Sequence, residues 1–142
     1  MNRIRPIAIC LFRHHDRILV AEGYDPVKKE AFYRPLGGGI EFGEYSEQTI
    51  ERELQEEIGA EVCDLKYLGT LENVFVFNGS PGHEIVQVFD GSLKDEQLYE
   101  QTVILGQEAD IEETFRAVWK RIDEFGNGKA ILYPNGLLEM LR

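Results

Sequence analysis

The chain has 142 residues, 43% of them hydrophobic and 29% charged, and its 15 basic and 26 acidic side chains leave a net charge of −11 at pH 7. These proportions predict one globular domain over residues 1–142 and exclude a largely disordered chain. No apolar stretch reaches the roughly 20 residues of a membrane-crossing helix, and the acidic balance disfavours binding to a nucleic acid duplex or an anionic membrane surface, since both carry negative charge.

The predicted elements begin with a β-hairpin in the first 22 residues. Ile7, Ile9 and Leu11 alternate as in a strand, residues 14–16 form a polar turn, and residues 18–21 predict the returning strand.

A short strand, a glycine run and a second strand are expected next. Phe32 and Tyr33 predict a strand that Pro35 ends. Residues 37–39 are all glycine and can adopt backbone angles closed to other residues. Residues 40–42 predict that the strand resumes after the glycines.

The apolar period then changes to that of a helix. Ile50, Leu54 and Ile58 recur every four residues and define one apolar stripe. Ser46 is a favourable N-cap and Gly59 is placed to end the helix. The pattern therefore predicts a helix over residues 46–58.

Strand composition returns after the helix. Residues 62–71, 73–77 and 84–93 predict three strands, the last two joined by the turn-rich loop 78–82. Residues 114–122 predict a further strand, and Pro134 lies near the first turn of a short terminal helix. This order of elements is typical of an α/β or α+β fold.

The two cysteines, Cys10 and Cys63, are far apart and lack metal-binding or redox spacing. Cys10 lies in the apolar run 7–12 and is predicted to be a buried thiol. The N-terminus has no basic segment followed by an apolar one of the kind that directs secretion. We therefore expect a cytoplasmic protein.

Acidic residues crowd residues 41–61, and three of them share one face of the predicted helix. At 100° per residue, Glu53, Glu56 and Glu57 project within an arc of about 100° beside the apolar stripe. Arg52 offsets only part of their mutual repulsion. Grouped carboxylates suit Mg²⁺ or Mn²⁺, although an acidic run by itself is also typical of a solvated helix face.

The segment from Gly38 to Ala60 resembles the Nudix box. That motif reads G-x5-E-x7-R-E-U-x-E-E-x-G-U, with U apolar, and the chain fills every fixed position, including Glu44 and the run that begins at Arg52. One departure lies before the box, where many members have Leu-Pro and this chain has Pro35-Leu36. The path of the strand that enters the box is therefore left open.

The resemblance implies a Nudix fold, a mixed sheet sandwiched between helices, and a hydrolase of nucleoside diphosphates linked to another moiety. It implies Mg²⁺ or Mn²⁺ as cofactor, with Glu53, Glu56 and Glu57 as metal ligands. Either Glu53 or Glu57 also acts as general base on the attacking water. Arg52 is expected to orient a glutamate such as Glu44 through a charge-assisted hydrogen bond.

Substrate contacts are expected at the start of the box and outside it. Gly38 and Gly39 would let the backbone approach the metal or the phosphate, and Arg34 would meet a phosphate. His83 is a weaker candidate for substrate contact. A further acidic ligand or base is expected from one of four residues after the helix: Asp95, Glu96, Glu100 and Glu108. Four aromatic residues are candidates for stacking on a base or for core packing: Phe75, Phe77, Tyr99 and Trp119.

Two other functions compete with hydrolysis. One is a Nudix-like domain that binds a nucleotide metabolite without turnover, and the other is an interaction protein with an acidic face. The intact Arg52, Glu53, Glu56 and Glu57 argue against the silent binder, which has no need of all four. The expected partner is a small-molecule nucleotide, with no nucleic acid duplex and no membrane, and the resemblance makes a homodimer an expectation.

Overall fold

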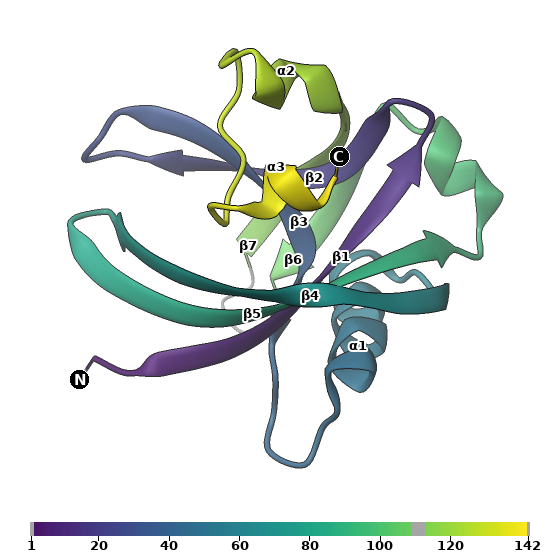
Figure 1. Ribbon diagram of the computed structural model, residues 1–142. Coiled ribbons are helices and arrows are strands. Elements are labelled where there is room, and N and C mark those ends of the chain that lie inside the picture. The colour runs from purple at the N-terminus through teal and green to yellow at the C-terminus, as the bar shows by residue number, and fades with distance from the viewer. Residues whose placement is uncertain (1, 109–112, 142) are drawn as a thin grey trace.

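The computed structural model describes residues 2–108 and 113–141, whose strands form one mixed sheet (Figure 1). The strand order is β4-β5-β1-β3-β2-β7-β6, in which β1 and β5 run parallel. The strands are β1 (Ile4–His14), β2 (Arg17–Asp25), β3 (Glu30–Gly39), β4 (Val62–Phe77), β5 (Ser80–Leu93), β6 (Val103–Glu108) and β7 (Glu113–Arg121). The helices are α1 (Ser46–Ile58), α2 (Ile122–Gly126) and α3 (Leu137–Met140), with a 3-10 turn η1 (Glu96–Glu100).

Helices cover both faces of the sheet. Figure 1 shows α1 on one side and α2 with α3 on the other. Alternate side chains of β1 point to opposite faces, so Cys10 packs in the core that contains Leu54 of α1, and Ile9 packs in the core that contains Leu137 of α3. This arrangement confirms the predicted mixed sheet between helices. Cys10 is fully buried as expected, and burial raises the pKa of its thiol.

The N-terminal hairpin and the central helix form as predicted. β1 and β2 pair around a turn in which His15 has a left-handed backbone (φ 58°). α1 spans the predicted residues, and Gly59 ends it. The predicted N-cap was wrong by one residue, because Ser46 is the first helical residue and the cap is Tyr45, whose N–H donates to Gln48 Oε1 (2.8 Å).

The strand that enters the motif is longer than predicted. β3 continues through Pro35 to Gly39, since the pairing passes at this point from β2 (Val20 with Pro35) to β1 (Cys10 with Leu36). Proline has no N–H to donate, and it is placed where one ladder gives way to the other. The glycines therefore lie in a strand and not in a loop.

Residues 40–42 do not resume a strand. Ile40 N–H donates to Pro6 O (3.0 Å), after which Glu44 N–H donates to Glu41 O (3.0 Å) and the chain turns toward α1. The loop predicted at 78–82 is also shorter in the structure, because the turn closes at Asn78 and Gly79 and β5 begins at Ser80. Residues 62–77 form one bulged strand, β4.

Three elements were not predicted from the sequence: β6, η1 and α2. β6 pairs with β7 and packs against α1. Pro134 lies before α3, with its carbonyl accepting from Leu137 N–H (3.2 Å). Within the described parts of the chain, no helix has both the length and the apolar composition needed to cross a membrane.

Candidate active site

α1 holds its acidic face against the glycine end of β3. Its apolar stripe is buried in the core, with Leu54 fully buried, and the helix packs on β3 and β6. Gly59 ends the helix in a left-handed conformation (φ 65°), and its N–H donates to Gln55 O (3.0 Å). Glycine favours that conformation because it lacks a Cβ. The sequence thus fixes the end of the helix that presents the carboxylates.

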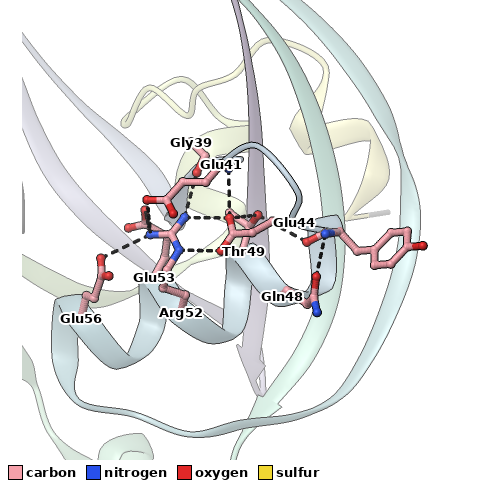
Figure 2. Close-up of polar contacts among 9 residues, drawn as sticks. Gly39, Glu41, Glu44, Gln48, Thr49, Arg52, Glu53 and Glu56 are labelled. Atoms are coloured by element: carbon pink, nitrogen blue, oxygen red, sulfur yellow. Dashed lines mark hydrogen bonds and ion pairs between the residues drawn. The ribbon is translucent and has the colours of Figure 1, made fainter.

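Arg52 is the centre of a polar network at this face (Figure 2). Its Nε and Nη2 donate to both oxygens of Glu44 (2.7 and 3.0 Å). Nη1 donates to Glu53 (2.9 Å) and to Glu56 (3.3 Å), and Nη2 also donates to Gly39 O (3.0 Å). One guanidinium therefore links three carboxylates of the motif to the glycine strand, and its planar fork suits such two-oxygen contacts.

Glu44 is anchored as an anion. Besides Arg52, its Oε1 accepts from Thr49 Oγ1 (2.9 Å) and from Glu41 N–H (3.0 Å). The hydrogen bond with Arg52 is the main reason that the pKa of Glu44 falls to about 2, against the opposing effect of burial. Glu44 and Arg52 therefore hold each other in place, and this pair is the one through which the resemblance implied that Arg52 orients a glutamate.

Glu53 and Glu57 occupy a different environment. Burial raises the pKa of Glu53, and Arg52 opposes the rise. Glu57 is only 6% exposed, and burial raises its pKa to about 9, with the charges of Glu108 and Glu53 adding to the effect. The backbone N–H of Gly37 and the charge of Arg34 act in the opposite direction. The carboxylates thus crowd one another with too little positive charge to neutralise them.

Gly38 leaves room for one of these carboxylates. A Cβ at this position would overlap the carboxyl group of Glu53. The strand can approach α1 this closely only because residue 38 has no side chain. The first fixed residue of the motif therefore sets the space in which Glu53 lies.

A surface groove runs between the glycine strand and α1, with a volume of about 420 Å³. Carboxylates line it from α1, from β6 and from the loop between β3 and α1, and arginines line it from α1, from β1 and from the residue before β1. The acidic residues are Glu41, Glu53, Glu56 and Glu108, and the basic ones are Arg3, Arg5 and Arg52. Such a groove offers negative groups for a cation and positive groups for phosphate oxygens.

The structure separates the acidic residues proposed outside the motif. Glu108 of β6 reaches the groove and acts on the pKa of both Glu53 and Glu57. The side chain of Asp95 caps η1 by accepting from Gln97 N–H (3.0 Å). Glu96 also belongs to η1 and does not line the groove. Glu100 lines a separate cavity with His14 and Trp119. Of these four candidates, Glu108 is the one that the fold places beside the helix.

The other candidates fall into three places. Arg34 lines a second cavity, next to the groove, together with Phe75 and Phe77. Tyr99 and Trp119 stack on each other (5.2 Å between centroids, 24° between planes) and pack against the core. His83 lines a separate surface pocket with residues of the N-terminus.

Sequence reasoning missed several polar residues of the second cavity, among them Arg5, Asn73 and Glu84. A signal was present for Glu84, since it alternates with Val86 and Val88, both fully buried on one face of β5. A carboxylate in register with two buried valines points toward the interior. Asn73 had no such signal, because its burial depends on the neighbouring strand.

The carboxylate set fits a hard divalent cation. Within residues 2–108 and 113–141, no three acidic, His or Cys side chains are already grouped as metal ligands, and Arg52 donates to both Glu53 and Glu56. However, Glu57 Oε1 is buried with no hydrogen-bond partner. Uncompensated buried oxygens of this kind are rare, and oxygen ligands are those that Mg²⁺ and Mn²⁺ prefer.

The thermal stability of the metal-free protein is expected to fall as the pH rises from about 5 to about 9. The folded-state pKa of Glu57, about 9, lies above its ordinary value of 4.5. Protonated Glu57 therefore contributes fully to the free energy of unfolding below pH 4.5, and this contribution is lost as the pH passes the folded-state pKa. Melting curves in EDTA across this range test it. Glu57→Gln should reduce the dependence of the melting temperature on pH. Glu51→Gln, at an exposed position of the same helix, should leave that dependence unchanged. An equal slope in Glu57→Gln would contradict the assignment.

Comparison with known proteins agrees with this geometry. A sequence model of the NUDIX domain matches residues 1–138. The NAD-capped RNA hydrolase NudC of Pseudomonas aeruginosa (strain LESB58) is 38% identical over 68 residues, which are 48% of this chain and 24% of that protein. Its counterpart in Mannheimia succiniciproducens is 38% identical over 96 residues, 68% of this chain and 30% of that protein. The matches thus span 24% and 30% of the length of these two relatives.

A solved structure shows the same fold. The crystal structure of a MutT NUDIX hydrolase from Burkholderia pseudomallei superposes with a TM-score of 0.67 at 17% identity, covering 99% of this chain and 100% of that one. At this identity the likeness concerns the fold, and it confirms the mixed sheet between helices.

Proposed function

This chain belongs to the NUDIX domain family, and from that membership we propose that it hydrolyses a phosphoanhydride bond in a nucleoside diphosphate linked to another moiety. It is a Nudix-type pyrophosphohydrolase, an enzyme acting on acid anhydrides. Nudix hydrolases generally use divalent metal ions, and Mg²⁺ or Mn²⁺ is the cofactor proposed here. The observation that carries the proposal is the groove that carboxylates of α1 line together with Arg3 and Arg5.

The proposed ligands of the cation are Glu53, Glu56 and Glu57, with Glu108 as a further acidic residue at the groove. When bound, the cation neutralises phosphate oxygens and lowers the pKa of a bound water. Arg52 keeps Glu53 and Glu56 in place and is in turn fixed by Glu44. These two residues therefore act by positioning the ligands.

The remaining steps belong to the chain's own groups. Glu53 or Glu57 accepts the proton of the attacking water, since both carry a raised pKa on the helix from which Glu53 lines the groove. Arg3 and Arg5 line the groove and would bind the phosphate oxygens of the substrate. Arg34 adds positive charge from the neighbouring cavity, and Gly38 and Gly39 leave the backbone of β3 open to the phosphates.

The proposal also covers location and partners. It places the enzyme in the cytoplasm, as one catalytic domain over residues 1–142 that acts on small nucleotides and forms a homodimer. The net charge of −11 supports a small anionic substrate over a nucleic acid duplex. The capped-RNA substrate named for the NudC relatives is a reason to include NAD among the compounds tested.

A screen of nucleoside triphosphates, nucleotide sugars, dinucleotides and NAD tests the activity. Each compound is incubated with the protein and Mg²⁺ or Mn²⁺, and the products are identified by mass. We expect at least one compound to yield two phosphate-bearing products, with no reaction in EDTA. Thermal stabilisation by a nucleotide without any product would favour the silent binding domain instead.

A further inference from the structure

A second cavity, of about 240 Å³, lies beside the catalytic groove, between the β2–β3 and β4–β5 hairpins. Figure 1 shows these two hairpins extending to the same side of the molecule. The ring of Phe32 meets Phe77 and Tyr133 edge to face, with centroids 5.9 and 5.5 Å apart. The cavity is smaller than pockets that hold whole small molecules, which measure roughly 300–1,000 Å³. The aromatic walls therefore enclose space for one planar ring system and not for a whole nucleotide.

Two polar side chains, Asn73 and Glu84, line the same cavity, and each is 5% exposed. They are register partners on β4 and β5, and Asn73 Nδ2 donates to Glu84 Oε1 over a long 3.4 Å. A carboxylate can only accept, so the amide must turn its nitrogen toward Glu84. That orientation leaves Asn73 Oδ1 buried and without a partner. The cavity therefore carries one buried acceptor, Asn73 Oδ1, that lacks a donor.

We propose that this cavity binds the base of the substrate and selects a ring with two adjacent N–H donors, the edge that guanine has and adenine lacks. The inference rests on the proposed function, since the phosphates of the same nucleotide would lie in the groove. Glu84 accepts from both donors of the ring, and Asn73 Oδ1 accepts from the exocyclic amino group. These two residues are the specificity-determining residues of the site.

The donor pattern excludes the other common bases from the same fit. Adenine and cytosine place a ring nitrogen lone pair beside the amino group, so one oxygen of Glu84 would face a lone pair. Uracil has one N–H between two carbonyls. Leaving a buried carboxylate oxygen unpaired is costly, and sites built around such hydrogen bonds reject analogues that lack the donor.

The two cavities are joined by residues of β1 and β3. Arg5 lines both, and its Nη1 lies 3.7 Å from Glu84 Oε2. Arg34 lines the aromatic cavity, and Gly38 lines the groove on the same strand. Four residues of strand span roughly 13 Å. The base and the phosphates of one extended nucleotide can therefore occupy the two cavities together.

Calorimetric binding of GMP, AMP and IMP in the presence of Mg²⁺ tests the inference. These monophosphates contain no anhydride, so binding is measured without turnover. We expect GMP to bind at least about tenfold more tightly than AMP, the scale of one two-point base contact, with IMP between them because it has only the ring N–H. Equal or tighter binding of AMP, or no binding of any of the three, would overturn the proposal.

Variants assign the preference to its residues. Glu84→Gln offers one donor and one acceptor, and the GMP preference should fall below about threefold. Asn73→Ser should weaken the binding of GMP more than the binding of AMP. This variant provides the test if Glu84→Gln does not fold. Glu72→Gln is the matched control, being exposed on β4 next to Asn73, and should keep the wild-type ratio. An unchanged ratio in Glu84→Gln would overturn the assignment.

Failure of this inference is distinguishable from failure of the proposed function. Selective binding of GMP without release of product from any anhydride would support the base site and contradict the proposed hydrolase activity. Hydrolysis of nucleotides without any preference for guanine would support the proposed hydrolase activity and contradict the base site.

Discussion

Glu53→Gln is expected to lower kcat by at least about 100-fold, the scale of a lost acid–base or metal-ligand function. The substitution keeps the shape of the side chain but removes the charge that would bind the cation or accept the proton of water. Glu53 lies at the meeting point of Arg52, Gly38 and the groove, so its loss affects positioning as well. Initial rates at saturating Mg²⁺ and substrate measure the change.

The matched control is Glu51→Gln, which removes the same charge from an exposed position on the same helix. Its turnover and its melting temperature should both stay near the wild-type values. Glu57→Gln should behave like Glu53→Gln in turnover. Wild-type turnover in Glu53→Gln would remove this residue from the catalytic machinery.

Gly38→Ala is expected to lower kcat by about 100-fold although it alters no charged group. The added methyl would overlap the Glu53 carboxyl group, because β3 and α1 meet closely at this point. The carboxylate must move, and displacements of about 1 Å in an active site can cost about 100-fold in rate. The rate is measured as for Glu53→Gln, with the melting temperature as a check on folding.

A double-mutant cycle shows whether the methyl acts through Glu53. If it does, Gly38→Ala combined with Glu53→Gln should be no slower than Glu53→Gln by itself. Additive losses in the double variant would mean that Gly38 serves the substrate or the backbone directly. In that case the role proposed for this glycine would need to be reassigned.

The metal and phosphate sides of the groove were predictable from the sequence to different degrees. The three carboxylates and Arg52 could be placed together because they lie within two turns of one helix, whose period is fixed by local geometry. The pairing of Arg52 with Glu44 followed from the motif resemblance. Arg5 carried no local signal, since its place depends on β1 lying next to β3.

Strand limits were harder to predict than strand existence. Pro35 argued for the end of a strand by a sound local rule, yet β3 runs on because its ladder partner changes from β2 to β1 at that residue. Residues 103–108 gave no clear alternation, and β6 exists through pairing with β7 and packing on α1. Long-range pairing decided both cases.

The sequence by itself determined the helix over residues 46–58, its glycine end, the N-terminal hairpin and the acidic face of the motif, because each depends on contacts within a few residues. Only the tertiary structure decided that Glu108 reaches Glu53 and Glu57, and that Asn73 and Glu84 meet in a buried cavity. The first case brings strand β6 to helix α1 and the second pairs two strands. Both depend on the order of the sheet and on how helices cover it, which are set by burying the whole apolar surface at once.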